Sequence, residues 1–454
     1  MSLRQAVIAV GLVLVCTAAL AQVPGQNINM VSGTTWPAGD PYLQRQNEPS
    51  MAVSSRNPEH LLAGSNDYRT VDIPDPKAPN ILGDAWLGVY TSLDGGETWK
   101  STLLPGYPQD TSKLGTASPL HAFTVATDPT VRAGTHGLFY YSGLVFNRGT
   151  GMPSGVFVAT FQDQNNKGNG DAALLSSDAK PHGNPFSYLN ATVVDSGTTG
   201  QFLDKPWIAV DIPRPGRTAT CKINGQNVSS GYVYVFYTQF NGSQNNPSSK
   251  IKEVTSTNCG VSWSHPITLS QSEKLAQGTV AAIDPNTGTV YVAWRQISAG
   301  QNESNAIQYA YSSDGGKTFT APPPIFTFTA PTTKSPYIAG SVFDQAQVNN
   351  TTFRWLDVPT MAVDGNSQVW VAFSQRFNGP RANTYGSRIM LTTLAKGSSS
   401  WTKPMIADST APATAYGHQF MPSLNFAYGK IALAWFDSRR DNMESVLQCP
   451  GGGT

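Results

Sequence analysis

Short apolar segments rich in β-branched and aromatic residues recur along the chain, and turns that carry Gly, Asn, Asp and Pro separate them. Each repeat consists of a first short apolar strand, often preceded by a proline, then a turn and a second apolar and aromatic strand. Such segments predict antiparallel hairpins. The six copies are residues 48–53 with 61–64, 121–126 with 138–141 (the loosest copy), 205–210 with 232–236, 280–283 with 290–294, 358–363 with 369–373, and 421–424 with 431–435.

A second pattern, Ser-x-Asp-x-Gly-x-Thr-aromatic, follows the strand pairs in several copies. Residues 92–99 and 312–319 match it, and residues 256–263 form a weaker copy in which Asn258 replaces the aspartate. The carboxylate of Asp94 or Asp314 can accept hydrogen bonds from turn amides, and the second glycine permits positive φ. We therefore interpret Asp94, Asp314 and Asn258 as structural turn residues.

The composition excludes several classes of protein. The 42 Gly and 32 Pro favour many turns and argue against a helical protein or a coiled coil. A charged fraction of 13% and a net charge of +1 exclude a broad electrostatic footprint for nucleic acid. The 19 Phe, 17 Tyr and 10 Trp supply material for a core, which argues against a disordered chain.

The N-terminus resembles a secretory signal peptide. Arg4 provides a positive charge, an apolar stretch too short to span a membrane comfortably follows, and cleavage is expected after Ala21. We expect a secreted or periplasmic protein with no membrane span in the mature chain. Its expected organisation is a signal peptide (1–21), an N-terminal arm (22–45) and a repeat domain (46–454).

Three cysteines remain after cleavage, and an exported protein permits disulfides. Cys221 and Cys259 are the candidate pair, which leaves Cys449 over. The six histidines lack metal-ligand spacing, and no nucleotide-binding fingerprint occurs, so we expect neither metal nor cofactor.

The second pattern is identified as the Asp-box, or BNR repeat, and residues 45–440 resemble the sialidase superfamily. The resemblance implies an all-β fold: a six-bladed β-propeller of four-stranded antiparallel blades. It also implies that the Asp-boxes lie on the face away from the active site. The sixth blade has its first two strands near 421–427 and 430–436, but residues 441–454 are too short and Gly-rich for two more. Either the chain is a fragment, or residues 22–45 add outer strands and close the ring.

In such a propeller, the residues before each first strand and after each second strand face the same mouth. Five of the six second strands end with an arginine, and guanidinium groups suit bidentate binding of a carboxylate. These arginines predict an acidic ligand or an acidic sugar, although pairing with nearby carboxylates is the simpler structural alternative. They are Arg69, Arg148, Arg295, Arg376, and Arg439 with Arg440.

The resemblance implies specific roles. Asp67, in the stretch Asn66-Asp67-Tyr68-Arg69, matches the family's acid/base aspartate, and Tyr416 matches its tyrosine nucleophile. Arg295 and Arg376 match two of the three arginines that hold the sugar carboxylate. Two departures put sialidase chemistry in doubt, because Asn47 stands in place of the first arginine and Gln277 in place of the glutamate that assists the tyrosine.

Other carboxylates can also approach the mouth. Glu48, Asp67, Asp204, Asp357 and Asp437 are candidates, and two of them could form the acid and base of an ordinary glycosidase. Asp437-Ser438-Arg439 repeats the Asp-x-Arg of blade one, so we expect Asp437, Arg439 and Arg69 to contact substrate.

The sequence thus predicts a secreted sialidase-like glycoside hydrolase that acts on a glycan or glycoconjugate. The alternatives are a non-catalytic propeller that binds a glycan or a protein, and a structural propeller within a larger secreted protein.

Overall fold

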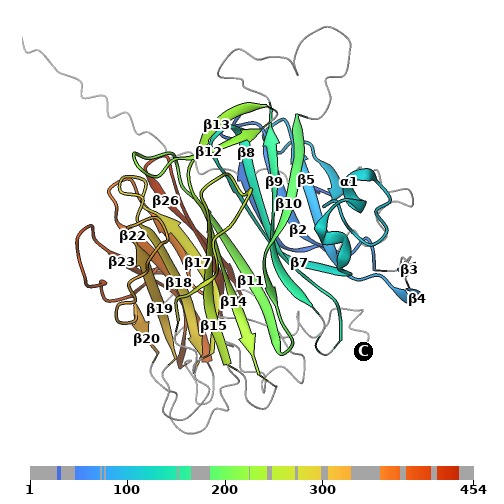
Figure 1. The fold of residues 1–454 in the computed structure, drawn as a ribbon. Coiled ribbons are helices and arrows are strands. Elements are labelled where there is room, and N and C mark those ends of the chain that lie inside the picture. The colour runs from blue at the N-terminus through green and yellow to red at the C-terminus, as the bar shows by residue number, and fades with distance from the viewer. Residues whose placement is uncertain are drawn as a thin grey trace, which may run out of the picture.

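The computed structural model describes residues 28–31, 46–71, 74–75, 78–149, 151, 153–164, 185–223, 225–242, 248–270, 275–297, 305–328, 358–378, 385–410 and 417–438. This part of the chain is almost entirely antiparallel β-structure, as the sequence predicted (Figure 1). Within it, no helix is long and apolar enough to cross a membrane.

Five four-stranded sheets follow one another along the chain, and a two-stranded sheet comes last. Each four-stranded sheet is built from strands that neighbour one another in the sequence once inserted hairpins are set aside, as expected for propeller blades. The sheets are β1 (Asn47–Val53), β2 (Leu61–Asp67), β5 (Trp86–Ser92) and β6 (Lys100–Leu103); β7 (Val125–Ala133), β8 (Leu138–Phe146), β9 (Ser154–Asp163) and β10 (Phe186–Gly197); β11 (Gln201–Val210), β14 (Val233–Asn241), β15 (Ser248–Ser256) and β16 (Ile267–Thr268); β17 (Leu275–Ile283), β18 (Val290–Ile297), β19 (Ala306–Ser312) and β20 (Phe326–Thr327); β21 (Thr360–Val363), β22 (Val369–Asn378), β23 (Tyr385–Leu394) and β24 (Met405–Ile406); and β25 (Gln419–Ala427) with β26 (Lys430–Asp437).

The remaining elements are short. One hairpin is inserted between the second and third strands of the first sheet, and another between the first and second strands of the third sheet. Three helical turns precede or follow β7. These elements are β3 (Pro74–Asp75) with β4 (Ala78–Leu82), β12 (Ala219–Ile223) with β13 (Gln226–Ser230), α1 (Lys113–Thr116), η1 (Pro119–Ala122) and η2 (Thr135–Gly137).

We call the first strand of each sheet its inner strand. The inner strands contact one another in chain order: β1 with β7, β7 with β11, β11 with β17, β17 with β21, and β21 with β25. Apolar side chains fill the space between successive sheets. On β8, for example, Phe139 packs toward the first sheet whereas Leu138 and Tyr140 pack toward the third. Because such strands are buried on both faces, they have the continuous apolar sequences seen in the repeats.

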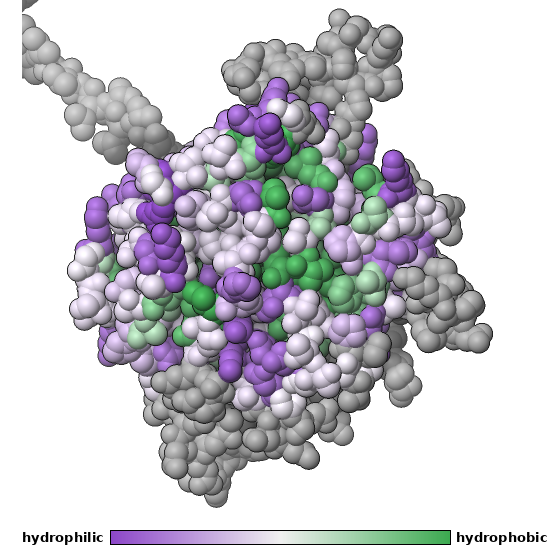
Figure 2. All heavy atoms as spheres, viewed as in Figure 1, coloured by the Kyte–Doolittle hydropathy of each residue, from purple (hydrophilic) through white to green (hydrophobic). Residues whose placement is uncertain are grey.

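The last sheet is less enclosed than the others. β25 and β26 lie where strands were expected, at 421–427 and 430–436. Met421, Tyr428 and Phe436 are exposed there, and the inner strand β1 of the first sheet is likewise mostly exposed. The face of the molecule in Figure 2 is otherwise mostly polar or weakly polar, with hydrophobic side chains gathered in small patches.

The second repeat was placed wrongly by the sequence pattern. The segment 121–126 was expected to be its first strand, but residues 119–122 form η1 and the inner strand β7 begins only at Val125. Ser118 caps this turn by accepting a hydrogen bond from the Leu120 amide, and Pro119 follows it, so the local sequence starts a helical turn. The second strand of this repeat, β8, was expected correctly at 138–141.

Five of the six inner strands, all except β21, share one irregularity. Their register shifts at a residue with left-handed backbone conformation, with φ of 53° at Glu48, 60° at Asp128, 48° at Lys205, 71° at Gly278 and 52° at Met421. Proline follows this residue in all of these strands except β17. We call it the bulge residue, and the register shift at this point is a β-bulge, a device that redirects a side chain.

The three turns of the second sequence pattern have the same hydrogen bonds. In the first, the Thr98 amide donates to Asp94 Oδ1 at 2.9 Å and the Gly96 amide donates to Ser92 Oγ at 2.8 Å. Asp314 and Asn258 repeat this arrangement, accepting from the amides of residues 318 and 262. Burial alone would raise the pKa of Asp314, but hydrogen bonds from Thr318 and Ser312 outweigh it and lower the pKa to about 2.

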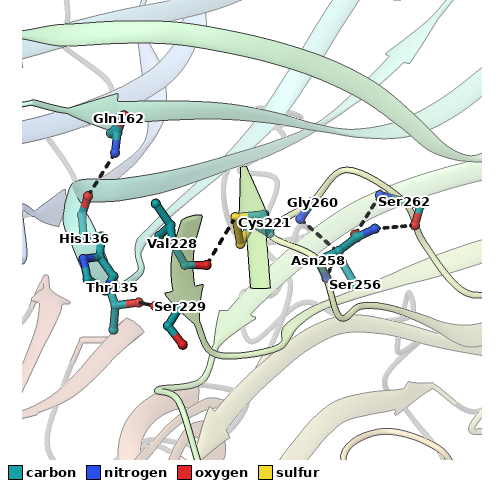
Figure 3. The surroundings of a disulfide bond; sticks show 11 residues. Thr135, His136, Gln162, Cys221, Val228, Ser229, Ser256, Asn258, Gly260 and Ser262 are labelled. Carbon is teal, nitrogen blue, oxygen red and sulfur yellow. Dashed lines mark hydrogen bonds between the residues drawn. A yellow bond between two sulfur atoms is a disulfide. The ribbon is translucent and has the colours of Figure 1, made fainter. Parts of the chain in front are cut away.

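Cys221 and Cys259 form the expected disulfide, with Cα atoms 6.0 Å apart. The bond ties the inserted hairpin β12–β13 to the turn after β15 (Figure 3). That turn is stabilised by the hydrogen bonds between Asn258 and Ser262, so the disulfide cross-links the hairpin to a hydrogen-bonded turn of the third sheet.

Candidate functional site

Three charged bulge residues meet beside the inner strands. Lys205 Nζ lies 2.9 Å from Glu48 Oε1 and 3.0 Å from Glu48 Oε2, and 3.2 Å from Asp128 Oδ1. These residues come from β1, β7 and β11, which are neighbouring inner strands. Because each occupies the same irregular position in its strand, the repeat itself brings the three side chains together. We call Glu48, Asp128 and Lys205 the charged cluster.

An asparagine connects two members of this cluster. Asn66, at the end of β2, donates from Nδ2 to Asn47 Oδ1 at 2.8 Å and to Glu48 Oε2 at 3.3 Å. The backbone amide of Asp128 donates to Asn66 Oδ1 at 2.8 Å. Asn66 is buried, so its amide holds the Glu48 side chain and the Asp128 backbone in fixed relation.

The polar site continues toward the fourth sheet. Gln277 Nε2, on β17, donates to Asp204 Oδ2 at 2.7 Å. Asp204 immediately precedes Lys205 and contributes to its electrostatic environment. Residues from four sheets therefore form one continuous set of polar contacts.

The charged cluster is reachable from solvent, although unequally. The side chains of Glu48, Lys205 and Asp128 are 45%, 30% and 12% exposed. Burial raises the pKa of Glu48, a hydrogen bond with Asp128 raises it further, and Lys205 opposes both. Burial alone would lower the pKa of Lys205, but the charges of Asp128 and Glu48 outweigh this and raise it. The site thus combines a carboxyl group biased toward its acid form, a second carboxyl group and a firmly charged ammonium.

Asp67 occupies a different environment from the charged cluster. It is fully buried within the first sheet, where Arg69 Nε donates to its two carboxylate oxygens at 2.9 and 3.0 Å and the Tyr90 hydroxyl donates at 2.8 Å. Burial and the negative charge of Asp67 raise the pKa of Tyr90 well above its usual value. In this arrangement Asp67 accepts hydrogen bonds inside a sheet and does not face solvent.

Three of the predicted arginines have described side chains, and each already has partners of its own. Arg148 is exposed and pairs with Asp84, with Nη2 donating to Asp84 Oδ1 at 3.1 Å. Arg69 is buried against Asp67 and also donates to Ser101 Oγ. Arg295 is buried in the fourth sheet, where Nη1 donates to the Ala306 carbonyl at 3.2 Å and the guanidinium lies 4.2 Å from the centre of the Phe328 ring. A ligand carboxylate could reach either of these two buried guanidinium groups only after these contacts were rearranged.

Several expected site residues cannot be placed. Tyr416 and Arg439 lie outside the described residues, and so does the side chain of Arg376. Asp437 is exposed at the end of β26, where Gln419 Nε2 donates to its Oδ2 at 3.2 Å. The substrate-binding and catalytic roles given to these residues, and to Asp67, Arg69 and Arg295, stay predictions.

Asp128 is the member of the charged cluster that sequence reasoning missed. The signal was present, because Asp128-Pro129 matches Glu48-Pro49 and Lys205-Pro206. Placing the second repeat at 121–126 hid this correspondence. Among the described residues, no group of three or more His, Cys, Asp or Glu is arranged to hold a metal ion.

Comparison with known proteins gives only distant similarities. No protein-family model matches the chain, and no curated protein matches it. Solved structures that are similar in fold include the following three. An α-L-arabinanase from Penicillium chrysogenum, complexed with arabinobiose, is 13% identical, with a TM-score of 0.43 over 87% of this chain and 94% of its own. A sialidase from Trypanosoma rangeli, in complex with the inhibitor DANA, is 11% identical, with a TM-score of 0.41 over 86% of this chain and 52% of its own. A protein of unknown function from Dyadobacter fermentans is 13% identical, with a TM-score of 0.42 over 86% of this chain and 90% of its own. At these TM-scores the similarity assigns neither an activity nor a residue role.

Proposed function

We propose that this chain is a sialidase-like six-bladed propeller that hydrolyses a glycan, and that Glu48 and Asp128 are its two catalytic carboxyl groups. The observation that carries the proposal is the convergence of two carboxyl groups and a lysine from three inner strands at a solvent-accessible point. Paired carboxyl groups are the usual catalytic equipment of glycosidases.

The environment of each carboxyl group supports a division of roles. Burial and the hydrogen bond with Asp128 raise the pKa of Glu48, which suits a general acid that protonates the leaving oxygen. Lys205 Nζ lies 3.2 Å from Asp128 Oδ1, and a carboxylate beside a cation suits a base or a nucleophile.

The spacing predicts the stereochemical outcome. Both carboxyl groups contact the same ammonium nitrogen, at 2.9 and 3.2 Å. They therefore lie closer together than the roughly 6.5–9.5 Å that inverting enzymes need to place a water between them. We expect retention of the anomeric configuration, with Asp128 as the nucleophile.

The test is turnover of a panel of 4-methylumbelliferyl glycosides, including a sialoside, uronides and neutral sugars. For any sugar released, Glu48→Gln and Asp128→Asn should each lower kcat by about 10²–10⁴-fold, as expected for general acid–base groups. The matched control is Glu97→Gln, which changes an exposed glutamate in a turn far along the sheet from β1. Full activity in both cluster variants would exclude these roles.

A second candidate function is recognition of a glycan or a protein without catalysis. The burial of Asp67, Arg69 and Arg295 within their own sheets favours it, because the residues expected for sialidase chemistry face away from solvent. A glycan array probed with the folded, fluorescently tagged protein tests this function directly. Binding without turnover on the glycoside panel would support it, and turnover that depends on Glu48 would exclude it.

A further inference from the structure

Arg132 is an exception among the inner strands. It lies on β7, four positions after the bulge residue Asp128, and it is partly exposed. The equivalent positions of four other inner strands carry alanine, at Ala52, Ala209, Ala282 and Ala362. A long cationic side chain therefore lies at a position where four of the other five inner strands have a single methyl group.

Hydrogen bonds between inner strands show where this side chain points. Two positions after the bulge residue, Thr130 Oγ1 donates to the Pro206 carbonyl at 2.8 Å. Residues two apart on a strand lie on the same side, so Arg132 also points toward β11. Its guanidinium lies 4.5 Å from the centre of the Trp207 ring.

The partners of Arg132 leave its charge uncompensated. Nη1 donates to the Val131 carbonyl at 2.7 Å, and Trp207 is fixed in turn by donation from Nε1 to the Ala281 carbonyl at 3.2 Å. No carboxylate forms an ion pair with Arg132 among the described residues. Burial lowers the pKa of Arg132 to about 10, so the group stays charged at neutral pH but is poorly solvated.

A partly desolvated cation with one face on an indole ring is a suitable receptor for an oxyanion. The guanidinium fork can give two parallel hydrogen bonds to a planar carboxylate, and the aromatic ring beneath it fixes the plane in which they form. The two neighbouring inner strands, β1 and β11, carry alanine at the equivalent positions, Ala52 and Ala209. Along β7, Arg132 is four residues, or roughly 13 Å, from Asp128, and on β11 Trp207 is two residues from Lys205. The site therefore lies next to the charged cluster but is formed by different residues.

We propose that Arg132, stacked on Trp207, binds a carboxylate group. The carboxylate belongs either to a small organic acid or to an acidic sugar. Binding at this site does not require hydrolysis by the charged cluster, so the two proposals fail independently.

Thermal unfolding of the full chain tests the site. Sodium acetate and sodium glucuronate are each titrated to about 100 mM, with sodium chloride keeping the ionic strength constant and glucose as the neutral control. A ligand that binds only the folded state raises Tm in proportion to its occupancy. We expect a rise with glucuronate and none with glucose. A rise with acetate as well identifies the free carboxylate as sufficient, whereas a rise with glucuronate alone identifies an acidic sugar.

Variants then locate the effect. Arg132→Gln should weaken carboxylate binding at least tenfold, and Lys403→Gln, which removes one positive charge from an exposed position, should leave it unchanged. Arg132→Lys keeps the charge and loses the planar fork, so it should bind with intermediate affinity and serves if the glutamine variant does not fold. Equal responses in wild type and Arg132→Lys, or no carboxylate response in wild type, would overturn the proposal.

Discussion

Glu253 gives a quantitative test of how this fold treats a buried charge. It lies on β15 in the third sheet, 1% exposed, and its Oε1 accepts a hydrogen bond from the Thr255 hydroxyl. Burial raises its pKa from 4.5 to about 8, with that hydrogen bond opposing the shift. The carboxyl group is therefore protonated in the folded protein at neutral pH.

The sign of the pH dependence follows from proton binding in the two states. Between pH 4.5 and pH 8 the folded chain keeps the Glu253 proton and the unfolded chain releases it. Stability is then greatest below pH 4.5 as far as this group is concerned, and it falls as the pH rises toward 8. The slope is about 1.4 kcal/mol per pH unit, so the group removes about 3 kcal/mol from the free energy of unfolding between pH 5 and pH 7.

Replacement by glutamine isolates this effect. Glu253→Gln keeps the size of the side chain and cannot ionise, so its free energy of unfolding should lack the contribution that falls with pH. Chemical denaturation at pH 5, 6, 7 and 8 measures the difference between variant and wild type, which should grow by about 1.4 kcal/mol per unit. The exposed Glu97→Gln serves as the control, because it should give a difference that does not vary with pH. A constant difference for Glu253→Gln would mean that the buried carboxyl group is ionised in the folded protein, and the reasoning would be refuted.

Two other predictions concern the site and the third sheet. Asn66→Ala removes the amide that connects Glu48 to the Asp128 backbone, and it should lower kcat by about tenfold or more, with KM nearly unchanged. Because Glu48 acts in its protonated form, losing this hydrogen bond should shift the basic limb of the pH–rate profile to higher pH, whereas a purely structural role would lower stability without moving the profile. Replacing both Cys221 and Cys259 by alanine opens a loop of 38 residues. In the chain-entropy model this should lower the free energy of unfolding by about 4 kcal/mol, measured by denaturant unfolding against the oxidised wild type. An unchanged unfolding midpoint would mean that the disulfide does not restrain the unfolded chain.

The repeats were visible in the sequence because each sheet starts with the same local chemistry. A bulge residue, usually followed by proline, begins the apolar part of the inner strand, and both faces of the next strand are buried. These features are local, so they can be identified without knowing which segments meet. The first strand of the second repeat was misplaced because the apolar match at 121–126 was stronger than the Asp128-Pro129 signal.

The direction of a side chain depends on distant residues, and there the sequence was a poor guide. Asp67 and Arg69 follow a strand and look like mouth residues, but they turn into the first sheet and pair with each other. Gly88, 21 positions later on β5, makes this possible, since a Cβ at Gly88 would lie 2.8 Å from Asp67 Oδ2 and 2.2 Å from the Tyr90 hydroxyl. The contact of Asp67 with Tyr90 and Gly88 on the neighbouring strand cannot be inferred from the spacing of these residues in the sequence.

The bulge residues separate what the fold requires from what the site adds. A non-glycine residue in the left-handed region costs about 1–2 kcal/mol, yet the conformation persists at Met421, which carries no charge, and at Gly278, which relieves the strain. The backbone irregularity therefore belongs to the repeat and gives no evidence of catalysis by itself. What sets the first three sheets apart is that the same irregular position carries a glutamate, an aspartate and a lysine, in strands that lie next to one another. We therefore infer the functional site from the charges and not from the bulges. Glu48, Asp128 and Lys205 are charged bulge residues that lie on three neighbouring inner strands.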